Sequence, residues 1–467
     1  MSRDTAHLGE KPIIGLFFGI ALPIAVGMMV HGLYNVVDAI FVTRALGTNA
    51  MGGISIVFPI QMFIIALATL IGSGMASIVA RQLGAKKSEA AQATIDMAMR
   101  LALGFAIVLS LGIYINMQEI LMFMGVSDAL MPYAVDYLLP ITLIGIPICM
   151  INQIPADALR AEGKAMYMMA TMTLSAVLNI ILDAVFIFGL ESGVEGVAYA
   201  TVISQFVAMA IGFWFFIANK TQLKIRPFAY PADNKVLNEI IILGIPILIS
   251  HAGVSIFIAF TNFSLAQISD IDNDLYISAY GLIGRLVMFA ILPLIAITIA
   301  FQTIAGYNYG ARQYSRVRST VKVGLTIALC YGLLMSTIMT LAPYPIIGIF
   351  TKQTELIHAA AGIALWVFMA FPLANAHGLA SAFFQAIGKA REALFLSSLR
   401  IYVLLLPGLL ILPAFYGLKG LWLAFPIADT GAFIIVMILL LRERRRLVMQ
   451  EQAQLAQQQI LQQGGKP

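Results

Sequence analysis

Residues 13–43 read IIGLFFGIALPIAVGMMVHGLYNVVDAIFVT, and Asp38 is the one acidic or strongly basic side chain in that stretch. A helix needs about 20 mostly apolar residues to cross a bilayer. The run is too long for the apolar part of a signal peptide and has no clear small-residue cleavage site after it. It therefore predicts a membrane-spanning helix.

Similar runs follow along the whole chain, which is 60% hydrophobic and only 11% charged over 467 residues. An ordinary soluble domain is about 25% charged. Lipid cannot pair with backbone polar groups, and the period-two alternation of barrel strands is absent, so the runs predict helices. We expect an all-α integral membrane protein with about 12 transmembrane helices. The expected spans are 13–43, 51–76, 92–116, 130–156, 167–190, 194–218, 238–268, 276–302, 320–343, 356–383, 392–414 and 418–441.

The basic residues predict the orientation in the membrane. With a cytoplasmic N-terminus, 23 of the 28 Lys and Arg residues fall in cytoplasmic segments and three in outer loops. Such asymmetry follows the positive-inside rule. We expect a multi-pass protein of the cytoplasmic (inner) membrane with both termini inside. The basic residues are not gathered on one polar surface, which argues against nucleic acid as a partner.

The chain repeats itself at a nearly constant offset of 223 to 226 residues. Four pairs of segments show this: GIALPI at 19 and LGIPIL at 243, RQLGAKKS at 81 and YNYGARQYS at 307, RAEGKA at 160 and QAIGKA at 385, and GVEGVAYA at 193 and GLKGLWLA at 417. Parallel repeats of this kind are typical of transporters, with the site between or within the halves. We expect two parallel six-helix lobes, 1–218 and 237–441, a linker at 219–236, and a basic, Gln-rich cytoplasmic tail at 442–467.

Catalytic and cofactor motifs are absent from the sequence. The five histidines are scattered, the two cysteines lie in apolar runs, and no GxxxxGK[ST] loop occurs. Metal and nucleotide sites need closer spacing or those glycines. We therefore expect no enzyme activity, no structural metal and no cofactor.

Polar residues form one stripe on the first helix. His31, Tyr34, Asn35 and Asp38 are spaced i, i+3, i+4 and i+7, which places them on one face. A carboxylate at this depth costs a few kcal/mol by insertion scales, so it must face protein or water. Asp38 is either a structural hydrogen-bonding group or, as we expect, an ion or proton site.

The fifth and sixth expected helices carry possible partners. Asn179 and Asp183 share one helical face, and so do Thr201 and Gln205. Two carboxyl groups in one apolar pocket cannot both ionise comfortably, so one proton or a small cation would relieve the repulsion. The second half has no acids at the matching positions, which hold Thr261, Val403 and Pro407 in the order of Asp38, Asn179 and Asp183. We therefore expect ion coupling in the N-terminal half.

Other residues are candidates of second rank. Asp429 and Arg400 predict either an ion pair that joins two helices or a second coupling site. Arg285 has no partner evident from the sequence, and Pro23 can bend the first helix, either as a fixed kink or as a hinge. The expected cavity for small organic cations is lined by His31, Tyr34, Asn35, Tyr137, Asn152 and Gln205.

The chain resembles the multidrug and toxic compound extrusion (MATE) family, and is most similar to its DinF-like branch. The resemblance lies in YNVVDAIFVTRALG at 34–47, GSGMASIVARQLGA at 72–85, LNIILDAVFIFG at 178–189 and YGARQY at 309–314. It implies a V-shaped bundle that exports organic cations in exchange for H⁺ or Na⁺ by alternating access. It also implies a cation site at Asp38, Asn179, Asp183 and Thr201. The acids that the NorM-like branch carries on helices seven and ten are missing here.

Three other classes are weighed against this secondary antiporter, for which we expect a monomer. A major-facilitator transporter would carry a GxxxDRxGRR-like stretch after its second helix, where this chain has ARQLGAKKSEAA. A lipid-linked oligosaccharide flippase of the same superfamily remains the main alternative, but would often have about fourteen spans and a cationic cavity. An intramembrane enzyme would need a metal site or a serine dyad at depth.

Overall fold

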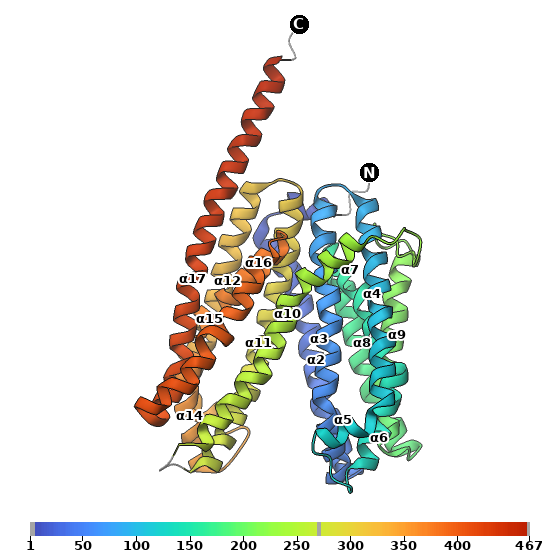
Figure 1. Cartoon of the computed structure of the whole chain (residues 1–467), viewed down its shortest axis with the longest axis vertical. Coiled ribbons are helices and arrows are strands. Elements are labelled where there is room, and N and C mark those ends of the chain that lie inside the picture. Colours follow the sequence, from blue (N-terminus) through green and yellow to red (C-terminus); the bar gives the residue numbers. More distant parts are fainter. Residues whose placement is uncertain (1–4, 269–271, 465–467) are drawn as a thin grey trace. The chain divides into compact units, whose positions relative to one another are not determined.

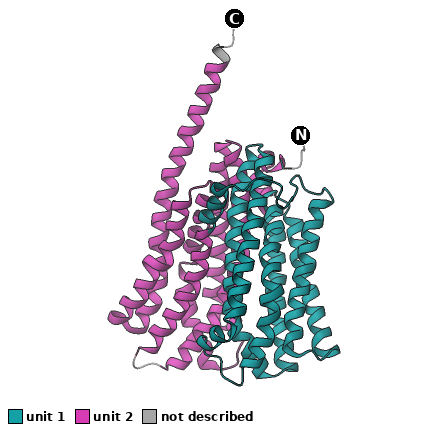
Figure 2. Cartoon of the chain, turned by 45° about the vertical axis from the view of Figure 1, so that its right-hand side comes forward, with its two compact units in different colours: residues 1–5, 19–244 teal, residues 6–18, 245–467 magenta. Residues whose placement is uncertain are grey.

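The computed structural model describes residues 5–268 and 272–464, and within these ranges the chain is helical without strands (Figure 1). The first four residues and the last three of the basic tail lie outside this part of the chain. The chain forms two compact units, residues 1–5 and 19–244, and residues 6–18 and 245–467 (Figure 2). The chain passes from one unit to the other at residues 5–6 and, inside a helix, at residues 18–19 and 244–245.

The helices of the first half include two π-helical segments, labelled η. They are α1 (His7–Glu10), α2 (Ile13–Ala45), α3 (Thr48–Gly84), α4 (Ser88–Ile115), α5 (Met117–Phe123), α6 (Met131–Pro140), η1 (Ile141–Gly145), α7 (Ile146–Ala161), α8 (Ala165–Ala184), η2 (Val185–Gly189) and α9 (Gly193–Ile217).

The second half begins with the long helix α10. Its helices are α10 (Asn234–Ala266), α11 (Asn273–Gly310), α12 (Tyr314–Leu341), α13 (Pro343–Ile347), α14 (Thr354–Met369), α15 (Phe371–Ala386), α16 (Ala390–Ser398), η3 (Leu399–Leu405) and α17 (Leu406–Gly464).

Ten stretches of helix in the described residues are long and apolar enough to cross a membrane, or eleven if the bent pair α14 and α15 counts as one span. The expected number was about twelve. The difference arises in the stretch Ala390–Leu461, which contains both of the last two expected runs. Gly417 interrupts its helical backbone with φ 55° and ψ −137°. Residues on either side pack against each other, with Gly408 beside Ala424 and Gly420 beside Leu412, so the chain turns back on itself there.

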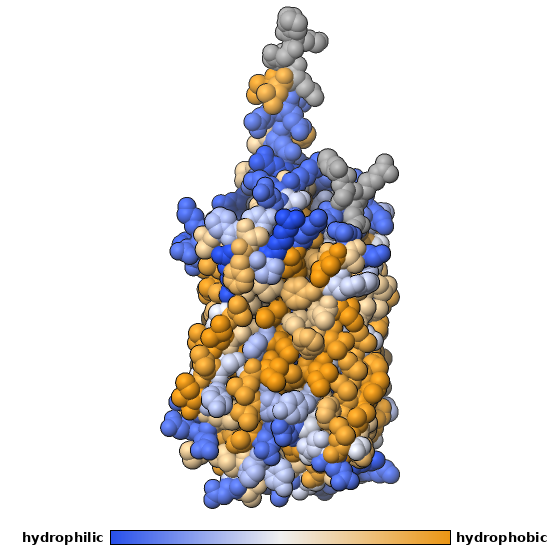
Figure 3. All heavy atoms as spheres, turned by 90° about the vertical axis from the view of Figure 1, so that its right-hand side faces the viewer, coloured by the Kyte–Doolittle hydropathy of each residue, from blue (hydrophilic) through white to orange (hydrophobic). Residues whose placement is uncertain are grey.

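Apolar side chains cover the middle of the face drawn in Figure 3, between hydrophilic residues at both ends. Val108, Leu111, Phe206 and Trp214 are among the exposed large hydrophobic residues of unit 1, each more than half exposed. Such exposure would be unfavourable in water and is expected in lipid. The chain is therefore a multi-pass membrane protein.

Two glycines allow α3 to cross the start of α10 at very short range in unit 1. A Cβ atom added to Gly74 would lie 2.1 Å from the carbonyl oxygen of Ile240, and one added to Gly244 would lie 2.2 Å from that of Leu70. The two helices can approach because glycine has no side chain between their backbones. Close backbone packing stabilises helix pairs in lipid, where association depends on van der Waals contacts.

The segment between α9 and α10 is bound to unit 1 at two points. At the first, the buried carboxylate of Glu162 accepts hydrogen bonds from the backbone N–H groups of Gln222 (3.1 Å) and Leu223 (3.0 Å). The ammonium of Lys164 lies 3.7 Å from Glu162 and donates to the carbonyl of Lys220. We call this arrangement the first clip.

The second clip uses the same chemistry with an acid from α4. The buried carboxylate of Asp96 accepts hydrogen bonds from the backbone N–H groups of Phe228 (2.5 Å) and Tyr230 (3.2 Å). Arg100 forms an ion pair with Asp96 at 2.9 Å and donates to the carbonyl of Tyr230. Each clip thus pairs a carboxylate that accepts N–H groups with a cation that donates to a carbonyl group.

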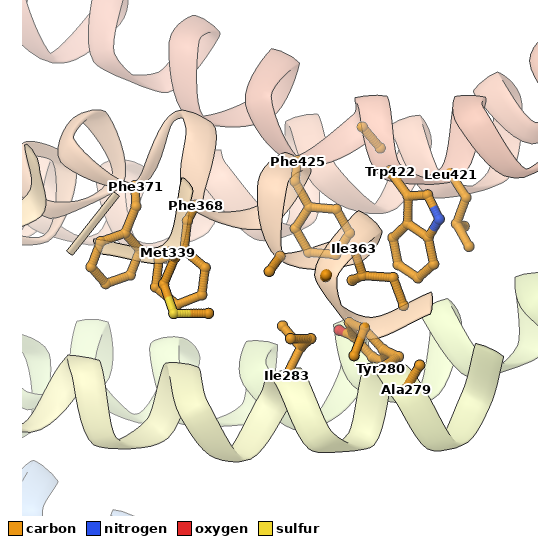
Figure 4. Close-up of a cluster of buried hydrophobic side chains, with 14 of the residues drawn as sticks. Ala279, Tyr280, Ile283, Met339, Ile363, Phe368, Phe371, Leu421, Trp422 and Phe425 are labelled. Atoms are coloured by element: carbon orange, nitrogen blue, oxygen red, sulfur yellow. The ribbon is translucent and has the colours of Figure 1, made fainter. Parts of the chain in front are cut away.

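The core of unit 2 contains an aromatic cluster from α11, α14, α15 and α17 (Figure 4). The ring centroids of Tyr280 and Trp422 lie 5.8 Å apart, and those of Tyr280 and Phe425 lie 6.4 Å apart. Phe368 and Phe371 extend the cluster. These rings fill the space between helices with apolar surface.

Candidate functional site

Two carboxyl groups meet inside unit 1. Asp38 on α2 and Asp183 on α8 lie close enough together for their carboxyl groups to share a hydrogen bond. Asp183 is fully buried. A hydrogen bond between two carboxyl groups needs a proton on one of them, so the pair is suited to hold a single proton, or a cation in its place.

One oxygen of Asp38 still lacks a hydrogen bond. Oδ1 is buried and has no partner among the residues that the structure describes. No ion pair in this part of the chain involves Asp38, whereas two other acids inside the helices, Asp157 and Asp429, each have an arginine partner. A buried acceptor without a donor costs about 1–3 kcal/mol or more, so a ligand that satisfies it is favoured at this point.

Asn179 and Thr201 lie beside the acid pair. Asn179 is one turn before Asp183 on the same face of α8, and its Nδ2 donates to Thr201 Oγ1 on α9 at 3.3 Å. Thr201 Oγ1 donates to the carbonyl oxygen of Val197 at 3.2 Å. All four residues of the expected cation site, Asp38 included, are thus contributed to the interior of unit 1 by α2, α8 and α9.

Tyr137 lies near both the acid pair and Thr201. It comes from α6 and is only 4% exposed. Gln61 Nε2 on α3 donates to the Tyr137 hydroxyl oxygen at 3.2 Å. Gln61 was not among the residues predicted from the sequence. Its signal is that it is the one polar side chain between Ser55 and Thr69.

The other expected cavity residues lie at different distances from the acids. Tyr34 is in electrostatic contact with Asp38, Asp183 and Tyr137. The ring of His31 lies 4.6 Å from that of Tyr34, centroid to centroid, but His31 itself is exposed.

Three further cavity candidates have no hydrogen bond or ion pair with the acids among the described residues. Asn35 is exposed, and its Nδ2 donates to the carbonyl of His31, one turn back on the same helix. Asn152 on α7 and Gln205 on α9 are half-buried. These three side chains therefore belong to the helices of the site but not to its hydrogen-bonded centre.

π-helical segments adjoin the site on two helices. η2 begins at Val185, two residues after Asp183, and η1 begins at Ile141, four residues after Tyr137. A π-helical turn contains an extra residue and redirects the side chains around it, and such turns are frequent at functional sites. Pro23 lies within α2, whose helix continues from Ile13 to Ala45.

The candidates of second rank lie in unit 2. Arg400 Nε on η3 donates to Asp429 Oδ1 on α17 at 2.5 Å, and Asp429 is 2% exposed. The Tyr280 hydroxyl lies close to Thr261 and to Arg400. Arg285 is exposed on α11 and has no ion pair in the described part of the chain. A group of three or more His, Cys, Asp or Glu residues able to hold a metal does not occur among the described residues.

Comparisons with known proteins identify the family of the chain. A family model described as MatE matches residues 23–185 and 246–411. The multidrug export protein MepA of Staphylococcus aureus is 25% identical over 433 residues, which is 92% of this chain and 94% of that protein. MepA of Staphylococcus haemolyticus is 25% identical over 426 residues, 91% of this chain and 92% of that protein.

Solved structures match over nearly the whole chain. A crystal structure of MATE in the bent conformation has a TM-score of 0.88 at 25% identity and covers 97% of this chain and 99% of that one. An outward-facing multidrug resistance MATE family transporter of the MOP superfamily gives 0.87 at 25% identity, with the same two coverages. Since the family model matches well over half of the residues, in one block in each sequence repeat, the chain belongs to the MATE family of membrane transporters.

Proposed function

We propose that the protein is a secondary active exporter that exchanges organic cations for H⁺, or for Na⁺, by alternating access. The observation that carries the proposal is the proximity of Asp38 and Asp183, one of which is fully buried, within unit 1. The family and the multidrug export function named for its relatives in Staphylococcus support it.

Exchange follows from the charge of the acid pair. When the pair has released its proton it carries excess negative charge in a poorly solvated pocket, and an organic cation is attracted. When the pair holds a proton or Na⁺, that attraction is weakened, so each ligand disfavours the other. The driving force is sufficient, because moving one charge across 100 mV is worth about 2.3 kcal/mol.

The residues around the pair suit a cationic, partly apolar substrate. Tyr34 and Tyr137 present aromatic rings beside the carboxyl groups. Aromatic faces attract cations, more strongly where water is excluded. Asn179 and Thr201 supply neutral polar atoms that a proton or a small cation would contact when it is bound.

Charge placement supports an inner-membrane location with both termini in the cytoplasm. Most Lys and Arg residues fall at one end of the expected spans. Both sequence repeats lie in one chain, so we propose that a single copy carries out transport, without a bound cofactor.

Transport into everted membrane vesicles tests this function. Ethidium should accumulate in the vesicles when the lumen is made acidic, or when the Na⁺ concentration is made higher in the lumen than outside, each gradient being applied alone. Loss of accumulation after both gradients are collapsed supports antiport and identifies the coupling ion. Accumulation that persists without either gradient would overturn the proposal.

A further inference from the structure

The last helix, α17, keeps one face buried beyond the end of its apolar part. It continues past the other helices of unit 2 as a single helix (Figure 1). The side chains of Ala432, Val436, Leu440, Glu443 and Leu447 are each less than a tenth exposed. They follow one another at intervals of three or four residues, which places them on one face of the helix. This face packs against α12, α14 and α15, so the contact with unit 2 extends into the basic tail.

Two ion pairs fix the rotation of the helix in this region. The buried carboxylate of Glu443 pairs with the ammonium of Lys389, at the start of α16. The carboxylate of Glu451, two turns further along, pairs with Arg318 of α12. These are the two acids of the tail, and both are engaged by cations of unit 2. The direction in which the opposite face points is therefore set by the protein itself.

The opposite face is apolar and then becomes basic. Ile434, Ile438 and Leu441 are each at least half exposed, as expected of side chains that meet lipid. Arg442 follows Ile438 by four residues and Arg445 follows Leu441 by four, so both arginines continue this face. Both are exposed, and neither forms an ion pair within the described ranges. The lipid-facing surface of α17 thus ends in two guanidinium groups without an anion.

The two arginines lie at the depth of the lipid phosphates. A helix rises 1.5 Å per residue, so Arg442 and Arg445 are separated by about 4.5 Å along the axis. The headgroup layer is about 5–7 Å thick on each side of the hydrocarbon core, so both positions fit within it. Helical side chains lean toward the N-terminus of their helix, which here is the direction of the membrane.

The chemistry of the site selects its ligand. A guanidinium group binds phosphate oxygens through two parallel N–H groups, and an apolar surface directly beside it suits acyl chains. We propose that Arg442 and Arg445 form a binding site for an anionic phospholipid, with its phosphate on the two guanidinium groups and its chains along Ile438 and Leu441. This interaction goes beyond the proposed transport function and does not depend on it.

The neighbouring arginines separate a site from a general attraction of charge. Arg444 carries the same charge as Arg445 but follows the buried Leu440 by four residues, so it lies on another side of the helix. Arg446 lies 4.0 Å from the carboxylate of Glu443, which compensates part of its charge. A tail that only attracted anions would depend on all four arginines alike, whereas a lipid site on one face depends on Arg442 and Arg445.

The test is native mass spectrometry of the purified full-length protein in a neutral detergent. The protein is titrated with dioctanoyl phosphatidylglycerol, with dioctanoyl phosphatidylcholine, and with glycerol phosphate, which has the phosphate but no acyl chains. Phosphatidylglycerol should bind the wild type most tightly. Arg445→Gln should weaken its first binding step about fivefold, and Arg442→Gln with Arg445→Gln roughly 25-fold, since one arginine near an anionic lipid is worth about 1 kcal/mol.

Arg444→Gln is the matched control, because it removes the same charge one residue away and should bind phosphatidylglycerol as the wild type does. If the double variant does not fold, the comparison of Arg445→Gln with Arg444→Gln decides. Equal losses in these two variants would show attraction by the net charge of the tail, and wild-type affinity in the double variant would place the lipid elsewhere. Either result overturns the site. Glycerol phosphate that bound as tightly as phosphatidylglycerol would overturn the assignment to a lipid.

Discussion

Units 1 and 2 share a repeated architecture but differ in chemistry at corresponding positions. The offset places Thr261 opposite Asp38 and Phe425 opposite Thr201. In unit 1 Asp38 lies close to a second carboxyl group, whereas in unit 2 Thr261 lies close to Tyr280, which packs against Phe425 (Figure 4). The same helix packing thus accommodates either a cluster of polar side chains or an apolar core.

The acids of the two units also differ in how they are compensated. Asp429 has the guanidinium of Arg400 at 2.5 Å, so its charge is satisfied within the protein. Asp38 has only a second carboxyl group and one unsatisfied oxygen. The difference favours a structural role for Asp429 and keeps Asp38 as the candidate for ligand binding.

The largest effect should come from Asp38→Asn. This change removes the charge that attracts cations, so gradient-driven ethidium transport into everted vesicles should fall to the level of empty vesicles while expression stays near normal. Thr261→Val, at the matching position of unit 2, should retain most of the transport. Equal loss in both variants would remove the functional distinction between the units.

A large effect on stability is expected from Asp429→Asn. It leaves Arg400 without an anion in a mostly buried position, and breaking such a pair costs about 3 kcal/mol. The melting temperature of the purified protein should drop clearly, and the double change Arg400→Leu with Asp429→Leu should recover much of it. Asp183→Asn should not lower it, since it removes repulsion. If Asp183→Asn lowered the melting temperature as much as Asp429→Asn, the difference proposed between the acids of the two units would be contradicted.

The pH dependence of ethidium binding should distinguish the two acids of unit 1, Asp38 and Asp183, from Asp429 of unit 2. Wild-type affinity for ethidium should weaken as the pH falls from 8 to 5, because proton binding neutralises the pair that attracts the cation. Asp183→Asn should lose much of this dependence. Identical curves for both proteins would show that competition occurs elsewhere, with Asp429 the next acid to test.

The smallest effect should follow from Thr201→Val. This variant keeps the size of the side chain but loses the hydrogen bond from Asn179, worth about 0.5–1.5 kcal/mol. Ethidium affinity at pH 8 should fall by roughly two- to tenfold. Ser204→Ala, which loses only a bond to the Thr201 carbonyl, is the control and should bind as the wild type does.

Much of the fold was predictable from the sequence, because lipid restricts the chain to apolar helices of a minimum length. The helical membrane class and the MATE resemblance are confirmed. The boundary between the last two spans was harder to predict, because no polar loop marks it. The chain turns at Gly417, within an apolar stretch, through the backbone conformation of that glycine.

The candidate site was predictable where helical spacing places residues on one face, as for Asn179 and Asp183. Contacts between distant helices leave little trace in a single sequence. Gln61 reaches Tyr137 across 76 residues, and only its isolation among apolar neighbours marked it. The carboxylates of Asp96 and Glu162 bind backbone N–H groups of no particular sequence, so nothing in the segment after α9 indicated that it is held.

The two clips shorten the part of this segment that is free to move. A free coil of the 16 residues between Ile217 and Asn234 would have a root-mean-square span of about 20–24 Å and could tolerate insertions anywhere. Fixed at Glu162 and Asp96, it keeps only three residues of slack after Tyr230, which reach about 10 Å when extended. The segment therefore acts as a short connection to α10 and not as a long flexible linker. Added length should be harmless between the clips, at residues 224–227, and disruptive after the second one.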